Sequence, residues 1–166
     1  MSTPEYPLSQ IIRIKKNRFE QAQKTLEEKK ELLTIEEKKL KKVEAERDEV
    51  LKHKIDKLQQ MRDEMDQGTT SDKIQQMKAY LKIVEERLDE KEKKVLRQQK
   101  EVDYAETQVE QAVDEVMRRQ KDLEKMEIHE KEWMTEAQME HEKKIETEHD
   151  ELGSMTYEQK RKKKLS

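Results

Sequence analysis

The sequence predicts an all-α protein in which two long helices form an antiparallel coiled-coil hairpin, the second helix longer than the first and overhanging it. Apolar residues recur every seven positions from Ile74 to Leu123, with companion positions three residues on, which is the pattern of a coiled-coil seam. The pattern is interrupted by a short polar stretch around Gly68. With 31% hydrophobic and 46% charged residues, the chain falls short of the roughly 45–50% apolar content of a globular core, but it can fill a seam.

The first helix is predicted over residues 8–67, after a lead-in of residues 1–7 that holds both prolines and that we expect to be loose. The first part of its seam consists of Ile12, Phe19, Leu26, Leu33 and Leu40. Beyond Arg47 the apolar residues resume one position later, at Leu51, Ile55, Leu58 and Met65. This displacement predicts a stutter, a local change of supercoil, near residues 47–51.

A turn is predicted over residues 68–71. Gly68 can adopt the left-handed conformation that ends a helix, and Ser71 or Asp72 can cap the next helix with a side-chain oxygen. The alternative is one continuous helix that tolerates this glycine at a cost of about 1 kcal/mol.

The two seams support the hairpin. If the turn centres near residue 69, paired residues have numbers that add up to 138 or 139. Leu26 then faces Ala112 in the first part of the pair, and Ile55 faces Val84 beyond the stutter. Apolar residues therefore meet along both parts of the predicted pair.

The second helix is predicted over residues 72–150. At about 1.5 Å per residue it reaches roughly 115 Å, against roughly 90 Å for the first helix. Gly153 is expected to end it and to leave residues 151–166 as a basic, flexible tail. Where the first helix runs out, we expect a cluster formed by Tyr6, Leu8, Met126 and Trp133.

No feature of the sequence predicts an enzyme, and we expect no cofactor, no metal ion and no small-molecule substrate. Neither glycine belongs to a phosphate-binding loop. Glu146 and His149 have the spacing of one ligand pair of a di-metal helical bundle, but no second pair faces them. The chain has no cysteine, which excludes disulfides and thiolate metal sites.

Charge and hydropathy predict a cytoplasmic protein. No apolar run approaches the roughly 20 residues that cross a bilayer, and the first residues lack the features of a signal peptide. The net charge is −3, and the basic cluster at 160–164 has no interleaved aromatic residues. We therefore expect no membrane insertion, and this pattern argues against a nucleic-acid partner.

The most specific local sequence is RIKKNRFEQA, from Arg13 to Ala22. Four positive charges lie within two helical turns of this segment, next to the seam residue Phe19. By itself the segment indicates an amphipathic helix with basic flanks. A short, cysteine-free coiled-coil hairpin that opens in this way resembles the FliJ/YscO family of type III secretion and flagellar export proteins. The likeness in kind covers almost the whole chain, and the likeness in sequence covers residues 8–30.

The resemblance implies a non-enzymatic central-stalk and escort protein, a monomeric hairpin at the cytoplasmic face of a secretion apparatus. The end with both termini would bind a hexameric secretion ATPase through Arg13, Lys15, Lys16, Arg18, Phe19 and Arg119. The turn end would contact an export-gate protein and secretion chaperones through Gln67, Thr69, Thr70, Lys73 and Met77. The acidic stretch and basic tail after residue 133 depart from the family's pattern.

A function of a different class stays open, that of a structural or tethering coiled coil that homodimerises through its heptad seam. It predicts a dimer, whereas the stalk function predicts a monomer. A third function, that of a small helical chaperone, needs exposed apolar surface, and a paired seam offers little of it.

Overall fold

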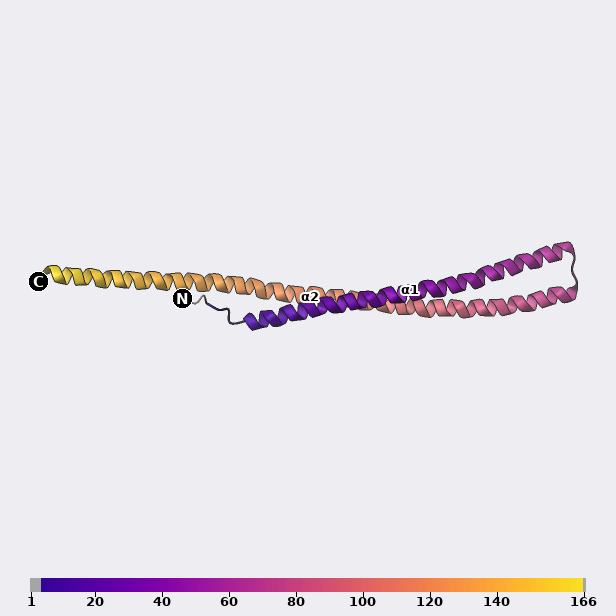
Figure 1. Ribbon diagram of the computed structural model, residues 1–166, viewed down its shortest axis with the longest axis horizontal. Helices are drawn as coiled ribbons and strands as arrows, with labels where there is room; N and C mark the ends of the chain where they lie inside the picture. The colour runs from indigo at the N-terminus through magenta and orange to yellow at the C-terminus, as the bar shows by residue number, and fades with distance from the viewer. Residues whose placement is uncertain (1–3, 166) are drawn as a thin grey trace. The chain divides into compact units, whose positions relative to one another are not determined.

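The computed structural model describes residues 4–165, which form two helices joined by a short turn (Figure 1). Helix α1 spans Ser9–Gln67 and has 59 residues, and α2 spans Ser71–Leu165 and has 95. The predicted all-α hairpin with a longer second helix is therefore confirmed. Neither helix contains, within the described residues, a stretch long and apolar enough to cross a membrane.

The chain divides into two units. One, here called the terminal unit, consists of Met1–Ala22 and Val116–Ser166. The other, the turn unit, consists of Gln23–Glu115. Each unit takes one part from α1 and one part from α2, so each contains its own stretch of paired helices.

In the turn unit the chain reverses direction, and α1 and α2 lie side by side on either side of the turn (Figure 1). Gly68 has a φ of 81°, and its N–H donates to the C=O of Met65 at 3.3 Å, so the predicted left-handed helix end is confirmed. The cap of α2 is Thr70, whose Oγ1 accepts a hydrogen bond from the N–H of Lys73 at 3.4 Å. Ser71 and Asp72 were expected in that role, but α2 already begins at Ser71.

The seam of the turn unit follows one unbroken heptad pattern. On α1 half-buried positions recur in steps of three and four residues: Leu26, Lys29, Leu33, Glu36, Leu40, Val43, Arg47, Val50, Lys54, Lys57, Met61 and Glu64. Glu44, Glu46 and Leu58 lie beside this frame and are half-buried as well. On α2 the buried or half-buried positions are Ile74, Met77, Leu81, Val84, Leu88, Lys91, Val95, Gln98, Val102, Ala105, Val109 and Ala112. The residue number of each seam position of α1 and that of the α2 position facing it add up to 138 in every case. One register therefore describes the whole unit.

The predicted stutter near residues 47–51 is therefore wrong. Leu51, Ile55 and Met65 are 39%, 56% and 47% exposed, and the seam holds Lys54 and Lys57 instead. The heptads of α2 continue without a shift, and in the structure α1 keeps the frame that matches them. Lysine is tolerated in a seam because its aliphatic stem covers apolar surface while its ammonium group points outward.

In the terminal unit the chain before α1 is packed, although we expected a loose lead-in. Tyr6 is 3% exposed, and its C=O accepts a hydrogen bond from the N–H of Ser9 at 3.2 Å. The buried core of the unit consists of Tyr6, Ile12 and Leu123, against which pack Leu8, Phe19, Met126 and Trp133. The predicted cluster is thus confirmed, and the lead-in is corrected from Pro4 onward. Its first three residues lie outside the described residues.

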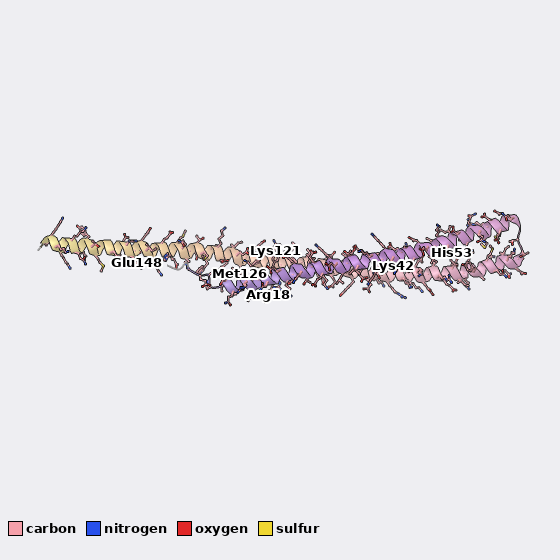
Figure 2. All side chains as sticks on the ribbon, viewed as in Figure 1. Arg18, Lys42, His53, Lys121, Met126 and Glu148 are labelled. Carbon is pink, nitrogen blue, oxygen red and sulfur yellow. The ribbon has the colours of Figure 1, made fainter. Side chains whose placement is uncertain are left out.

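Helix α2 continues through Gly153 to Leu165, which corrects the predicted helix end near residue 150 and the predicted tail. Gly153 does not have a positive φ, and a glycine inside a helix costs about 1 kcal/mol without forcing a break. Three lysines in the last turn complement the helix dipole. From Glu146 to Leu165 every residue is exposed, so no tertiary core supports this part of α2, which includes Glu148 in Figure 2. Ser166 lies outside the described residues.

Candidate functional site

The basic residues at the start of α1 fall into two groups. Arg13, Lys16 and Arg18 are exposed, Arg13 and Lys16 on one flank of α1 and Arg18 on the other, and together we call them the basic surface (Arg18 is labelled in Figure 2). Lys15 is half-buried, and its Nζ lies 3.7 Å from Oδ2 of Asp122 on α2. Lys15 therefore helps to join the two helices of the terminal unit, and it is not part of the basic surface.

Two isoleucines on the same stretch of α1 were not singled out from the sequence. Ile11 and Ile14 are 40% and 49% exposed, and with Arg18 they are spaced three and four residues apart on one helix face. Exposed apolar side chains among basic ones are typical of a protein-contact surface. The only signal in the sequence was that both isoleucines fall outside the heptad positions, which the seam interpretation did not use.

A depression of about 580 Å³ adjoins the basic surface. It is lined by Glu5, Ser9, Gln10, Ile12, Arg13, Lys16 and Glu130. Its lining combines both signs of charge with one apolar residue. The structure therefore places two residues of the basic surface beside the start of α1 and a carboxylate of α2.

Phe19 and Arg119, both predicted ATPase contacts, are less accessible than the basic surface. Phe19 is half-buried and packs against the core of the terminal unit. Arg119 is half-buried at a seam position of α2. Both side chains are therefore less accessible than those of Arg13, Lys16 and Arg18, which are exposed.

Tyr6 anchors the chain start to α2 beside this surface. Its ring centre lies 5.5 Å from that of Trp133 in an edge-on arrangement with an angle of 64° between the ring planes. Its hydroxyl group is hydrogen-bonded to Nδ1 of His129. Burial raises the pKa of the Tyr6 hydroxyl, and the negative charge of Glu130 raises it further. The phenol therefore stays neutral to a higher pH than that of a free tyrosine side chain.

The residues predicted at the turn end all lie in the turn unit. Gln67, Thr70 and Lys73 are exposed, and Thr69 and Met77 are half-buried. Two of them line a groove of about 350 Å³ between the helices, whose lining residues are Lys57, Gln60, Glu64, Lys73, Gln76, Met77, Tyr80 and Leu81. The structure thus brings Lys73 and Met77 into one groove, gives Thr70 a capping role, and leaves Gln67 and Thr69 outside the groove.

Tyr80 is the aromatic wall of this groove. Its hydroxyl group is hydrogen-bonded to Nε2 of His53 at 2.8 Å, and the Nζ of Lys57 lies 5.6 Å from its ring centre, within cation–π range. His53 and Tyr80 are 27 residues apart and flank the seam rather than fill it. For that reason heptad analysis did not identify them.

Polar pairs interrupt the seam farther from the turn. The side-chain amide of Gln98 donates to the main-chain oxygen of Glu36 at 3.1 Å and to its Oε2 at 2.5 Å. The hydrogen bond from Gln98, followed by that from Lys39, lowers the pKa of Glu36. These directional contacts across the seam can fix the register of the pair more tightly than apolar contacts alone.

The chemistry of these surfaces is that of protein recognition. Among residues 4–165, no three His, Asp or Glu side chains converge as metal ligands. The accessible groups are guanidinium and ammonium groups, isoleucine side chains on α1, and an aromatic ring in the turn-end groove. Such groups bind proteins through charge and apolar contact.

Comparison with known proteins identifies the family. The model of YscO-like proteins matches residues 3–163. A structure described as a YscO homolog, CT670 from Chlamydia trachomatis, is 42% identical, covers 93% of this chain and 96% of its own, and has a TM-score of 0.91. A chain in a structure of the Chlamydia pneumoniae CdsV and CdsO protein complex is 48% identical, covers 51% of this chain and 98% of its own, and has a TM-score of 0.49. No curated protein sequence matches. The predicted resemblance is confirmed: the chain belongs to the YscO-like family of type III secretion components.

Proposed function

We propose that the protein is a non-enzymatic coiled-coil component that binds the hexameric export ATPase at the cytoplasmic face of a type III secretion apparatus. The observation that carries the proposal is the basic surface, in which Arg13 and Lys16 are exposed on one flank of α1 and Arg18 is exposed beside Ile11 and Ile14 on the other flank. Membership of the YscO-like family of type III secretion components supplies the setting. Charged groups around apolar ones suit a partner that carries carboxylates beside an apolar patch.

The mechanism follows from symmetry. A pair of helices has no six-fold axis, so it cannot make the same contact with all six subunits of a ring. The basic surface would meet one or two subunits at a time and would bind them in one nucleotide state better than in the others. A ligand shifts a conformational equilibrium by its difference in affinity for the two states. The protein would therefore stimulate ATP hydrolysis by favouring an order of states around the ring.

The test is a charge reversal of Arg13, Lys16 and Arg18 to Glu in the full chain. We expect the variant to lose at least tenfold of the ATPase stimulation while its far-UV circular dichroism stays helical, because these side chains are exposed. The matched control reverses Lys38, Lys41 and Lys42, which are equally exposed on the turn unit, and keeps full stimulation. Full stimulation by the first variant would refute the basic contact.

Lys15 is left out of that variant because it has a structural partner. Reversing it to Glu places a carboxylate next to Asp122 and repels α2. Restoring the pair with Lys15→Glu and Asp122→Lys separates the two roles. If Lys15 also contacts the ATPase, the exchanged pair refolds but stimulates poorly.

The turn end is proposed to contact the export gate and secretion chaperones, with Lys73 and Met77 in the groove as the central residues. Lys73→Glu reverses an exposed charge at the groove, and Lys78→Glu reverses an exposed charge that does not line it. We expect the first to weaken co-precipitation with the gate's cytoplasmic domain about tenfold and the second to leave it unchanged. Equal binding by both variants would exclude the groove. ATPase stimulation is expected to be normal in both.

A further inference from the structure

Between Arg47 and Gln67, helix α1 carries two stripes of residues, either of which could face α2. The first, here called the seam stripe, is the one that faces α2 in the structure, and it consists of Arg47, Val50, Lys54, Lys57, Met61 and Glu64. The second, the outer stripe, consists of Leu51, Ile55, Leu58 and Met65. The outer stripe is the more apolar of the two, yet Ile55 is 56% exposed and Met65 is 47% exposed.

The face of α2 that packs against this part of α1 is apolar. Its seam positions there are Ile74, Met77, Leu81, Val84 and Leu88, of which Val84 is only 1% exposed. In the structure Val84 and Leu81 face Lys54 and Lys57, whose ammonium groups have polar or aromatic partners, whereas Leu88 and Met77 face Val50 and Met61. The Nζ of Lys54 lies 3.6 Å from Glu85, and that of Lys57 lies over the ring of Tyr80. At Leu81 and Val84, an apolar face that could meet leucine and isoleucine therefore meets lysine.

The two stripes are one residue apart, which corresponds to a rotation of α1 by about 100°. After such a rotation, the numbers of facing residues would add up to 139 instead of 138. Leu51 would then face Leu88, and Ile55 would face Val84. The outer stripe departs from Arg47 in steps of four residues, the spacing that lets a helix change supercoil gradually and without a break. The turn and the part of α1 before Arg47 could keep their places.

We propose that this part of α1 has two seatings against α2. In the charged seating, which the structure shows, the seam stripe faces α2, and the outer stripe is exposed except for the half-buried Leu58. In the apolar seating, the outer stripe is buried and Lys54 and Lys57 are outside the seam. The hairpin therefore contains a conformational switch that controls access to an apolar surface.

One contact holds the charged seating in place. The hydrogen bond between His53 and Tyr80, together with the edge-on contact of their rings at 5.9 Å, joins α1 to α2 beside the seam. Rotation that brings the outer stripe to α2 carries His53 away from α2. Removing the hydroxyl group with Tyr80→Phe is therefore expected to favour the apolar seating.

The chain has no cysteine, so a pair of introduced thiols reports on the seating by forming a disulfide. Val50→Cys with Leu88→Cys reports the charged seating, and Leu51→Cys with Leu88→Cys reports the apolar seating. Glu44→Cys with Val95→Cys is the matched control. Like the 51–88 pair, it joins an α2 seam residue to the α1 residue that follows its facing position, but here that facing position holds the apolar Val43. Each pair is oxidised in the otherwise native full chain, and the rate of disulfide formation is measured.

We expect the 51–88 pair to form within about tenfold of the rate of the 50–88 pair, and at least tenfold faster than the control pair. A 51–88 rate no higher than that of the control would overturn the proposal. Lys54→Leu with Lys57→Leu makes the seam stripe apolar, and it is expected to slow the 51–88 pair at least tenfold while the 50–88 pair is unchanged. If that double variant leaves the 51–88 rate unaltered, the cross-link reflects general flexibility and two seatings are refuted. Tyr80→Phe is expected to raise the rate of the 51–88 pair severalfold. An unchanged rate would show that the hydrogen bond between His53 and Tyr80 does not hold the charged seating.

Discussion

At the scale of single residues, Tyr6 shows how one side chain orders the start of the chain. It lies in the core of the terminal unit and contacts both Trp133 and His129. Large aromatic side chains bury much apolar area at a small cost in side-chain entropy, which makes them efficient anchors. The segment before α1 is packed for this reason, and Pro4 and Pro7 do not prevent it.

Truncation of Tyr6 tests this role. Tyr6→Ala removes the ring and is expected to lower the midpoint of thermal unfolding by roughly 5 °C or more, because the core beside Ile12 loses its cover. Tyr6→Phe keeps the ring and loses only the hydrogen bond to His129, so a drop of about 2 °C is expected. Trp133 is the only tryptophan, and its fluorescence should shift to the red in the alanine variant alone. Equal effects of the two variants would contradict the anchoring role of the ring.

Glu36 makes stability depend on pH. Its pKa is below the usual 4.5 because Gln98, and then Lys39, donate hydrogen bonds to the carboxylate. A lowered pKa in the folded state means that this contribution is complete above pH 4.5 and disappears as the pH falls through the folded value. Glu36→Gln is expected to flatten the loss of stability below pH 4.5 and to leave the slope above pH 6 unchanged, as measured by urea unfolding. An unchanged acid slope would exclude Glu36 as its source.

At the scale of elements, the two glycines have opposite roles although both are exposed. Gly68 has a φ of 81° and ends α1, whereas Gly153 lies inside α2 without a positive φ. No atom lies within 4 Å of an added Cβ at either position, so substitution by alanine reports on backbone conformation alone.

Substitution of the two glycines by alanine is therefore expected to change stability in opposite directions. Gly68→Ala is expected to destabilise the hairpin by about 1 kcal/mol, because an L-residue is strained at this φ. Gly153→Ala is expected to favour the local helix by about 1 kcal/mol, which should appear as a rise in helical ellipticity without a change in the unfolding midpoint. Thermal unfolding followed by circular dichroism measures both. A stabilising Gly68→Ala would contradict the left-handed turn.

The exposed end of α2 shows that helix formation and tertiary packing are separable. From Glu146 to Leu165 the helix has no buried residue. It is supported locally by the lysines of its last turn, which complement the helix dipole. We attribute the error in the predicted helix end to the weight given to Gly153, since one glycine does not outweigh a long run of good helix formers.

At the scale of the whole molecule, the internal seam predicts a monomer. In the turn unit the apolar positions of α2 are covered by α1 of the same chain, with Val84 and Val102 1% and 3% exposed. A second copy would have to displace α1 to reach them. Sedimentation equilibrium is expected to give a mass near 20.2 kDa at micromolar concentration. A mass of twice that value would favour the alternative of a tethering protein that homodimerises through its seam.

The sequence by itself determined the features that depend on local chemistry. Glycine's tolerance of a positive φ placed the turn at Gly68, and the heptads from Ile74 to Leu123 defined the face of α2 that is buried. The basic segment from Arg13 led to the correct family. Each of these signals lies along a single helix or at its end, so it could be recognised without a partner.

Only the tertiary structure decided which stripe of α1 faces α2 beyond Arg47, and that Lys15 pairs with Asp122 while Arg13 stays exposed. Two stripes there compete for the same seam, and hydropathy alone favours the one with Leu51 and Ile55. The structure places lysines in the seam because their stems cover Val84 and Leu81 while their charges reach Glu85 and the ring of Tyr80. That choice depends on groups of the opposite helix, and the pattern of one helix cannot contain it.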